Sequence, residues 1–185
     1  MNLPNPIFII SGASGAGKGT LIKGVMENHP EFQLTTSATT RPRRPSDGPN
    51  DYYFLTDEEF QKRIDDGEFV EWAQYAGNKY GTLKSELESK SKLGPVLLEI
   101  EIQGAAQIKK SGVAHTSIFV APPSMDELER RLRERKSDSE EAISKRLATA
   151  KEEMRAAPLY DHVIINDTIP EAVGELEKIV SSYVR

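Results

Sequence analysis

The stretch "GASGAGKGT" (Gly12–Thr20) decides the fold of this 185-residue chain. The apolar run "IFII" (Ile7–Ile10) precedes it and apolar residues at helical spacing follow it, so the glycines join a buried strand to a helix. A glycine followed by four residues and then Gly-Lys matches the first part of the phosphate-binding loop pattern. Glycines bring backbone N–H groups close to phosphate oxygens, and the following helix turns its positive end to the same anion. The sequence therefore predicts a loop that holds the phosphates of a nucleotide.

Lys18 carries the only charge in this loop and would reach the outer phosphates. Ser or Thr usually follows that lysine, whereas this chain has Gly19 and then Thr20, so the pattern assigns no hydroxyl to a magnesium ion. The alternative is a Gly-rich turn with a solvated lysine, which the flanking strand and helix disfavour. The candidate ATP-binding residues of the loop are Gly12, Ala13, Ser14, Gly15, Ala16, Gly17, Lys18, Gly19 and Thr20.

The composition is that of a globular protein with one main core: 37% of the residues are hydrophobic and 29% are charged. A net charge of −5 argues against an extended nucleic-acid surface. The chain has no cysteine, and its three histidines lack ligand spacing, so neither a disulfide nor a protein-bound metal site is expected. We see no signal peptide and no membrane span, and expect a cytoplasmic protein with neither a membrane partner nor an obligate protein partner.

Three further apolar runs alternate with helical patterns, which predicts an α/β fold with a parallel sheet. They are Val96–Ile100, Thr116–Ala121 and His162–Asn166. Predicted helix starts carry capping boxes, in the pairs Thr56 with Glu59, Ser124 with Glu127, Ser137 with Glu140, and Thr168 with Glu171. Residues 35–86 and 124–158 fit the parallel pattern poorly and are predicted to be insertions. The core would then comprise residues 1–34, 87–123 and 159–185, and two insertions on a phosphate-loop core suggest a two-substrate kinase whose second insertion closes over the nucleotide.

A basic cluster and neighbouring phenols suit a phosphate monoester. The cluster contains Arg41, Arg43 and Arg44, and "DYY" adds Tyr52 and Tyr53. Guanidinium forks and phenol hydroxyls both donate hydrogen bonds to phosphate oxygens. The alternative, a solvated basic loop, stays open on this pattern alone.

Carboxylates mark the next candidate site. Glu71 lies beside Trp72, and one carboxylate can accept from both N1–H and N2–H₂ of guanine, a donor pair that adenine lacks. The alternative is a surface salt bridge. Glu99 and Glu101 follow an apolar run and share one side of the predicted strand, at the edge where open α/β sheets bind ligands. Their alternation with isoleucines is also typical of a strand with one solvated face.

Two charged helices carry arginines that could neutralise a transferring phosphoryl group. Arg131 and Arg135 share one helix face, and Arg146 lies on the next helix. Exposed helices with i,i+4 ion pairs have the same composition, and the pattern does not choose between the two.

Taken together, these motifs resemble the guanylate kinase family. "TTSATTRPRR", "DYYF" and "GEFVEWAQYAGNKYGT" carry the resemblance, which extends from "SGASGAGKGT" through "IEIQG" and "IFVAPPS" to "IIND". The resemblance implies a P-loop three-layer core with a GMP-binding region (35–86) and a helical lid (124–158). It also implies transfer of a phosphoryl group from ATP to GMP or dGMP, with Mg²⁺ bound mainly through the ATP phosphates.

The resemblance also assigns roles to residues. Lys18, Arg41, Arg135 and Arg146 would be catalytic, and Asn166 would approach adenine. The residues implied to contact GMP are Ser37, Arg41, Arg44, Tyr52, Glu71, Tyr80, Thr82, Glu99 and Glu101.

The chain departs from the family pattern at a few positions. Glu99 and Glu101 replace the usual aspartates, so each carboxylate lies one methylene, roughly 1.5 Å, further out. The loop "PSDGPN" is shorter than usual, Thr82 replaces a common serine, and Lys136 stands where glycine is frequent.

Two other readings remain. Guanylate-kinase-like domains of scaffolding proteins bind phosphopeptides without catalysis, although they usually lack a working ATP loop. A kinase for another acceptor, such as AMP or a sugar phosphate, is the second alternative, because "GKGT" also occurs in adenylate kinases.

Overall fold

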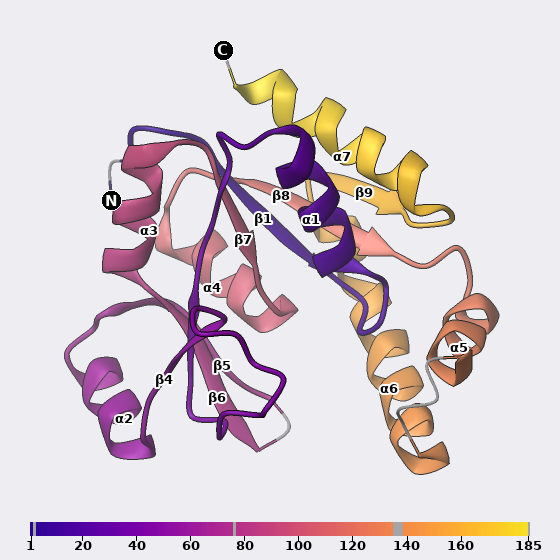
Figure 1. Ribbon diagram of the computed structural model, residues 1–185, viewed down its shortest axis with the longest axis horizontal. Helices are drawn as coiled ribbons and strands as arrows, with labels where there is room; N and C mark the ends of the chain where they lie inside the picture. Colours follow the sequence, from indigo (N-terminus) through magenta and orange to yellow (C-terminus); the bar gives the residue numbers. More distant parts are fainter. Residues whose placement is uncertain (2, 76, 135–138, 185) are drawn as a thin grey trace.

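The computed structural model describes residues 1, 3–75, 77–134 and 139–184 (Figure 1). Five strands form a parallel sheet in the spatial order β2-β7-β1-β8-β9, which confirms the predicted α/β fold. They are β1 (Ile7–Gly12), β2 (Gln33–Leu34), β7 (Val96–Glu99), β8 (Thr116–Ala121) and β9 (His162–Ile165). The apolar runs predicted every one of these strands except β2, which has two half-buried residues and no apolar run.

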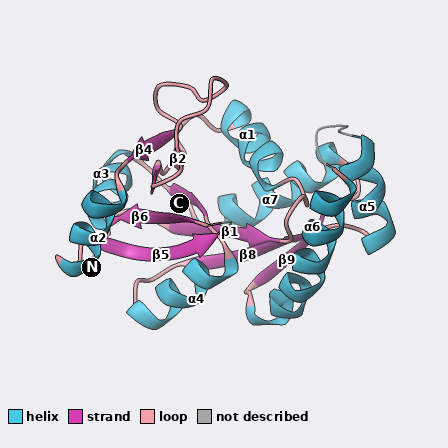
Figure 2. Ribbon diagram, turned by 90° about the horizontal axis from the view of Figure 1, so that it is seen from below, coloured by secondary structure: helices cyan, strands magenta, loops and turns pink. Residues whose placement is uncertain are grey.

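Helices cover both faces of this sheet because the side chains of its strands alternate. On β1, Phe8 and Ile10 join the core formed with α1 and α7, whereas Ile7 and Ile9 face α3 and α4. Figure 2 shows α1 and α7 on one side of the sheet and α4 on the other. These helices are α1 (Lys18–Asn28), α3 (Lys84–Leu93), α4 (Ile102–Ser111) and α7 (Ile169–Tyr183).

A second, smaller sheet lies within residues 35–86, in the order β4-β3-β6-β5. Its strands are β3 (Ser37–Thr39), β4 (Tyr52–Phe54), β5 (Phe69–Tyr75) and β6 (Asn78–Leu83). The ring of Phe60, on α2 (Asp57–Asp65), stacks on Phe69 with their centroids 4.4 Å apart. Thr56 and Glu59 form the predicted capping box at the start of α2. A one-residue irregularity in β5 between Phe69 and Glu71 shifts its register against β6.

Two helices form an arm beside the phosphate loop. They are α5 (Met125–Glu134) and α6 (Glu140–Glu153), and the 3₁₀ turn η1 (Met154–Leu159) leads from the arm to β9. Leu128 and Leu132 of α5 and Ile143 of α6 extend the core on the α1 side of the sheet. The arm is therefore packed against the elements that carry the loop.

The predicted caps outside the small sheet have different outcomes. The hydroxyl of Ser124 accepts from Glu127 N at 3.1 Å, as expected. Ser137 lies outside the described residues, and α6 begins after Ser139, whose hydroxyl accepts from the backbone of the new helix. At Thr168 the prediction was wrong, because the hydroxyl donates to the Glu171 carboxylate at 2.6 Å and caps no backbone N–H.

Among the helices that the structure describes, none combines the length and the apolar composition needed to cross a lipid bilayer.

Candidate active site

The phosphate loop leaves β1 where a side chain would not fit. Gly12 has a φ of +147°, and a Cβ atom there would lie 2.1 Å from the carbonyl oxygen of Val120. Gly17 has a φ of +95°, and a Cβ atom there would lie 2.5 Å from Asn166 Nδ2. Asn166 is almost fully buried and donates from Nδ2 to the carbonyl oxygen of Ala16 at 2.7 Å. Its amide thus holds the loop in shape from the end of β9.

The loop presents its N–H groups at the start of α1. Gly17 is the N-cap residue and supplies no side-chain acceptor, so first-turn N–H groups remain for a ligand. Lys18 Nζ donates to the carbonyl oxygens of Gly12 at 3.0 Å and Ala13 at 3.4 Å. The ammonium group therefore lies folded over the loop, in a position to pair with the phosphate oxygens of a ligand bound there.

A carboxylate from the arm accepts a hydrogen bond from one of the backbone N–H groups of the phosphate loop. Glu153, at the end of α6, accepts a hydrogen bond from Ser14 N at 2.6 Å. Burial, with Glu101 nearby, raises the pKa of Glu153 above its usual value. A backbone donor that suits a phosphate oxygen thus holds an internal anion in this structure.

Replacing Glu153 with Gln is expected to tighten ATP binding roughly three- to tenfold, because a competing charge-assisted hydrogen bond of about 1 kcal/mol is weakened. Titration calorimetry with ATP at pH 8 measures the effect. Glu152→Gln is the matched control, since Glu152 is exposed and pairs only with Arg155 among the described contacts. An ATP affinity that is unchanged or weaker in Glu153→Gln would show that Glu153 does not compete with the nucleotide.

A cleft of about 350 Å³ opens between the carboxyl edge of the core sheet and the small sheet. It brings together most of the residues predicted to contact an acceptor, as well as Lys18. The predicted residues that line it are Lys18, Ser37, Tyr52, Glu71, Tyr80, Glu99 and Glu101. The cleft is also lined by residues that were not predicted from the sequence, namely Leu34, Thr35, Asp51, Ala73, Tyr75, Gly81 and Ile100.

Glu71 is the most deeply buried carboxylate in the cleft, with 4% of its surface exposed. Burial raises its pKa to about 7, and contact with Thr82, directly across the β5–β6 pair, opposes this rise only in part. Thr82 itself is buried behind Glu71 and does not line the cleft. The surface salt bridge considered for Glu71 is thus wrong: this carboxylate is buried among the described residues without a basic partner.

Glu99 and Glu101 lie at the phosphate-loop end of the cleft. β7 ends at Glu99, and Glu101 is the N-cap residue of α4, so only Glu99 belongs to a strand. Desolvation raises the pKa of Glu99, and the charge of Lys18 counteracts it. A Cβ atom at Gly19 would lie 3.7 Å from Glu99 Oε2, so this carboxylate faces the first turn of α1.

The phenols of Tyr52 and Tyr80 meet on the opposite wall, with ring centroids 6.2 Å apart. Tyr52 pairs with Ser37 across β3 and β4, so all three come from the small sheet. Burial raises the pKa of Tyr52, which keeps the hydroxyl a hydrogen-bond donor at neutral pH.

Arg41 is held by an internal partner and does not line the cleft. Its Nη1 and Nη2 atoms each donate to Asp47 at 3.0 Å, and the guanidinium lies 5.2 Å from the ring centroid of Tyr52. These bonds hold the pKa of Asp47 below its usual value. Arg44 is exposed, and its backbone N–H donates to the same carboxylate at 2.5 Å. Neither arginine lines the cleft: Asp47 holds the Arg41 guanidinium behind Tyr52, and it binds Arg44 through the backbone only.

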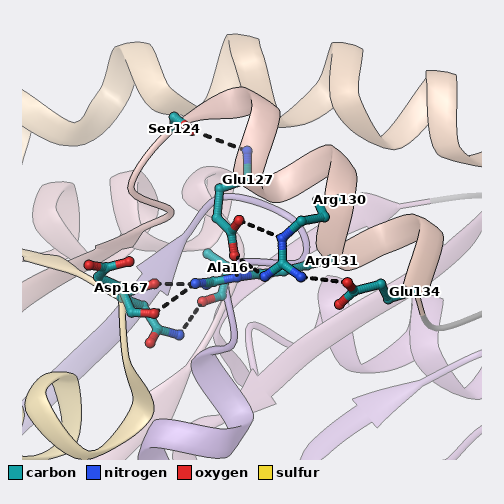
Figure 3. Close-up of polar contacts among 8 residues, drawn as sticks. Ala16, Ser124, Glu127, Arg130, Arg131, Glu134 and Asp167 are labelled. Carbon is teal, nitrogen blue, oxygen red and sulfur yellow. Dashed lines mark hydrogen bonds and ion pairs between the residues drawn. The ribbon is translucent and has the colours of Figure 1, made fainter.

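Arg131 has a different role from the one its helix position suggested. Its guanidinium donates to the carbonyl oxygens of Asn166 at 2.7 Å and Asp167 at 2.8 Å, and its Nε to Glu127 at 2.6 Å (Figure 3). It thus ties α5 to the end of β9. Arg146 lies beside the phosphate loop, since a Cβ atom at Gly15 would be 3.8 Å from its Nη2. Arg135 lies outside the described residues.

Comparison with known proteins agrees with this geometry. The sequence profile of the family described as guanylate kinase matches residues 5–183. The chain belongs to the guanylate kinase family. It is 48% identical over 176 residues to a guanylate kinase from Prochlorococcus marinus, covering 94% of this chain and 93% of that one. A guanylate kinase from Thermosynechococcus vestitus is 46% identical over 181 residues, which is 97% of this chain and 95% of the relative.

A solved member of the guanylate kinase family has the same fold. The crystal structure of guanylate kinase from Anaplasma phagocytophilum superposes with a TM-score of 0.78 at 31% identity, covering all of this chain and 89% of that one. The match includes the two segments that depart from the parallel core.

Proposed function

We propose that the chain transfers the γ-phosphoryl group of ATP to GMP, giving ADP and GDP, and that it accepts dGMP as well. The observation that carries this proposal is the common cleft, in which Lys18 of the phosphate loop and the buried carboxylate of Glu71 line opposite parts of one space. A phosphate donor and a purine acceptor would therefore meet inside it.

The base of GMP would be read by Glu71. Its two oxygens can accept from N1–H and N2–H₂ of guanine, Ser37 brings a hydroxyl group into the cleft, and Thr82 contacts Glu71 from behind. Adenine offers no matching pair of donors, so it would leave a buried carboxylate unpaired. Guanine is the base that fits a buried carboxylate without a basic partner.

The phosphate of GMP would lie at the wall formed by Tyr52 and Tyr80. Arg41 stands behind Tyr52, and its engagement with Asp47 leaves Nε and one Nη2 hydrogen for a phosphate. Arg44, three residues further along the chain, would contact the same phosphate when the site closes. In this account residues 35–86 form the GMP-binding region and residues 124–158 form the lid, on a core of residues 1–34, 87–123 and 159–185.

ATP would be held by residues 12–20, with its adenine near Asn166. The backbone N–H groups of the loop would donate hydrogen bonds to the phosphate oxygens, and Lys18 would leave its carbonyl partners to pair with the same phosphates. Arg146, beside the loop, and Arg135 would neutralise charge on the transferring group when the lid closes and excludes water.

In the transfer step an oxygen of the GMP phosphate forms a bond to the γ-phosphorus of ATP while the bond from that phosphorus to the β–γ bridging oxygen breaks. ADP leaves with the electron pair of the broken bond. The attacking phosphate is already anionic, so no side chain has to remove a proton. The residues of the chain contribute by holding the two oxygens in line and by stabilising the charge.

Divalent metal would arrive with ATP. The described residues contain no cluster of three or more His, Cys, Asp or Glu side chains able to hold a metal ion by themselves. Glu99, which faces the start of α1, would meet the water shell of a phosphate-bound Mg²⁺ ion, which suits the preference of Mg²⁺ for oxygen ligands. When bound, the ion would neutralise charge on the β and γ phosphate oxygens.

A coupled ADP-release assay with ATP, Mg²⁺ and each of GMP, dGMP, AMP, CMP and UMP tests the proposal. We expect turnover with GMP and dGMP only. Equal turnover with AMP would contradict guanine selection by Glu71, and silence of folded protein with every acceptor would favour the phosphopeptide-binding alternative.

A further inference from the structure

Helix α4 lies very close to the carboxylate of Glu71 at Gly104, where there is no side chain. A Cβ atom at Gly104 would lie 2.4 Å from Glu71 Oε2 and 3.0 Å from its Cδ. Gly104 lies in the first turn of α4, and its φ is not in the left-handed region. Glycine is an unfavourable residue in a helix, so backbone geometry does not explain its presence here. The contact with the carboxylate does.

A second contact, one turn along the same helix, fixes the strand that carries Glu71. Gln107 Nε2 donates to the carbonyl oxygen of Trp72 at 2.6 Å, and Trp72 N donates to Gln107 Oε1 at 3.1 Å. Residues three apart share one face of a helix, so Gly104 and Gln107 meet β5 together. The side-chain amide therefore sets the distance between α4 and β5 at the residue next to Glu71.

We propose that Gly104 and Gln107 position the carboxylate of Glu71 and so make α4 a determinant of base selection. This inference rests on the proposed role of Glu71 as the reader of guanine. The glycine lets the carboxylate lie at a depth where both of its oxygens meet the two donors of the base, and the amide keeps strand and helix at that depth. If the Glu71 carboxylate were displaced along the direction of its side chain, it could keep at most one of its two hydrogen bonds to guanine.

An added methyl group would move the carboxylate rather than the helix. Ordinary contact needs a separation of roughly 3.5 Å, so the two groups must separate by about 1 Å. The helix cannot retreat easily, because Gln107 ties it to β5 and because Ala105 and Ile108 of α4 are packed in the core under the main sheet. The end of the Glu71 side chain is the softer partner, and it faces the open cleft.

The decisive variant is Gly104→Ala, assayed with GMP and with IMP, which keeps N1–H but lacks the 2-amino group. We expect the KM for GMP to rise at least tenfold, with kcat within threefold of the parent and the KM for ATP unchanged. The GMP-to-IMP ratio of kcat/KM is expected to fall at least fivefold. Gly174→Ala is the matched control, because a Cβ atom at this glycine of α7 meets nothing within 4 Å. It should leave all these constants unchanged.

A double-mutant cycle separates positioning from a general effect on folding. If Gly104 acts through Glu71, adding Gly104→Ala to Glu71→Gln causes less than a twofold further loss with GMP. Losses that multiply, or a Gly104→Ala enzyme with the parent's GMP-to-IMP ratio, would overturn the inference while leaving the role of Glu71 intact. A Glu71→Gln enzyme that keeps the parent's GMP-to-IMP ratio of kcat/KM would instead overturn the proposed function of Glu71.

Gln107→Met removes both bonds to Trp72 and tests the same inference if Gly104→Ala does not fold. It should also lower the GMP-to-IMP ratio of kcat/KM.

Discussion

Lys18→Met is expected to lower kcat by roughly 10²–10³-fold or more, the range seen when one preorganised donor to a developing negative charge is removed. Methionine keeps the length of the side chain and removes the ammonium group that lies over the loop at 3.0 Å from Gly12 O. The affinity for GMP should stay within about twofold, since the base site around Glu71 is unchanged. Steady-state kinetics and calorimetry with GMP separate the two quantities.

The control for Lys18→Met is Lys23→Met in the same helix. Lys23 is 78% exposed and pairs only loosely with Glu27, at 3.9 Å. It should have the kinetics of the parent. A Lys18→Met enzyme with parental kcat would remove Lys18 from the mechanism.

Glu71→Gln is expected to lower kcat/KM for GMP by roughly 10²-fold, since two hydrogen bonds to a charged acceptor are replaced by one bond and one donor–donor contact.

The loss in kcat/KM caused by Glu71→Gln should also depend on pH. With a pKa of about 7, Glu71 in the free enzyme is about nine-tenths ionised at pH 8 and about one-tenth at pH 6. The KM of the parent for GMP should therefore rise about tenfold between pH 8 and pH 6. The KM of Glu71→Gln should lack this component, and because both enzymes see the same substrate phosphate, the difference isolates Glu71.

The same substitution should stabilise the protein. Burial raises the folded-state pKa of Glu71 from 4.5 to about 7, so between these values the folded state binds more protons than the unfolded state and stability falls as pH rises. The full penalty, about 3 kcal/mol, is present above pH 7 and absent below about pH 4.5. Urea unfolding should show Glu71→Gln to be more stable than the parent at pH 8, with the gain shrinking toward pH 5. An equal difference at both pH values would contradict ionisation of a buried carboxylate as its cause.

The sequence predicts the core well because hydrophobic periodicity and the glycine loop are local signals. Continuous apolar runs identify β1, β7, β8 and β9. The inner strands β1 and β8 are buried almost throughout, as expected in a parallel sheet, whereas β9 lies at the edge and leaves Val163 and Ile165 exposed. The order of those strands in the sheet, and β2 at its edge, depend on contacts between distant segments. The capping pattern at Thr168 failed for a related reason: the hydroxyl had two acceptable partners, and the sequence does not say which one it takes.

The sequence predicted which residue types form the site better than it predicted the contacts that hold them in place. Residue types singled out Lys18, Glu71 and Tyr52, and the family resemblance added Tyr80; the structure shows that all four line one cleft. The partners that hold the site together come from far along the chain. Glu153 reaches the loop from 139 residues away, and α4 meets β5 through a glycine whose role is visible only in space. For Arg131 the sequence left a phosphate contact and an i,i+4 ion pair open; the structure shows the ion pair with Glu127, together with bonds to two carbonyl oxygens at the end of β9.

The most direct test of the account follows the fate of the phosphoryl group itself. ³¹P NMR of the parent enzyme with equimolar ATP and GMP and with Mg²⁺ reports donor and acceptor in one spectrum. We predict that the phosphate signal of GMP and the β-phosphate signal of ATP fall in a one-to-one ratio while a nucleoside-diphosphate β-phosphate signal rises, with no inorganic phosphate. ADP accompanied by inorganic phosphate, or an unchanged spectrum from folded enzyme, would contradict transfer from ATP to GMP.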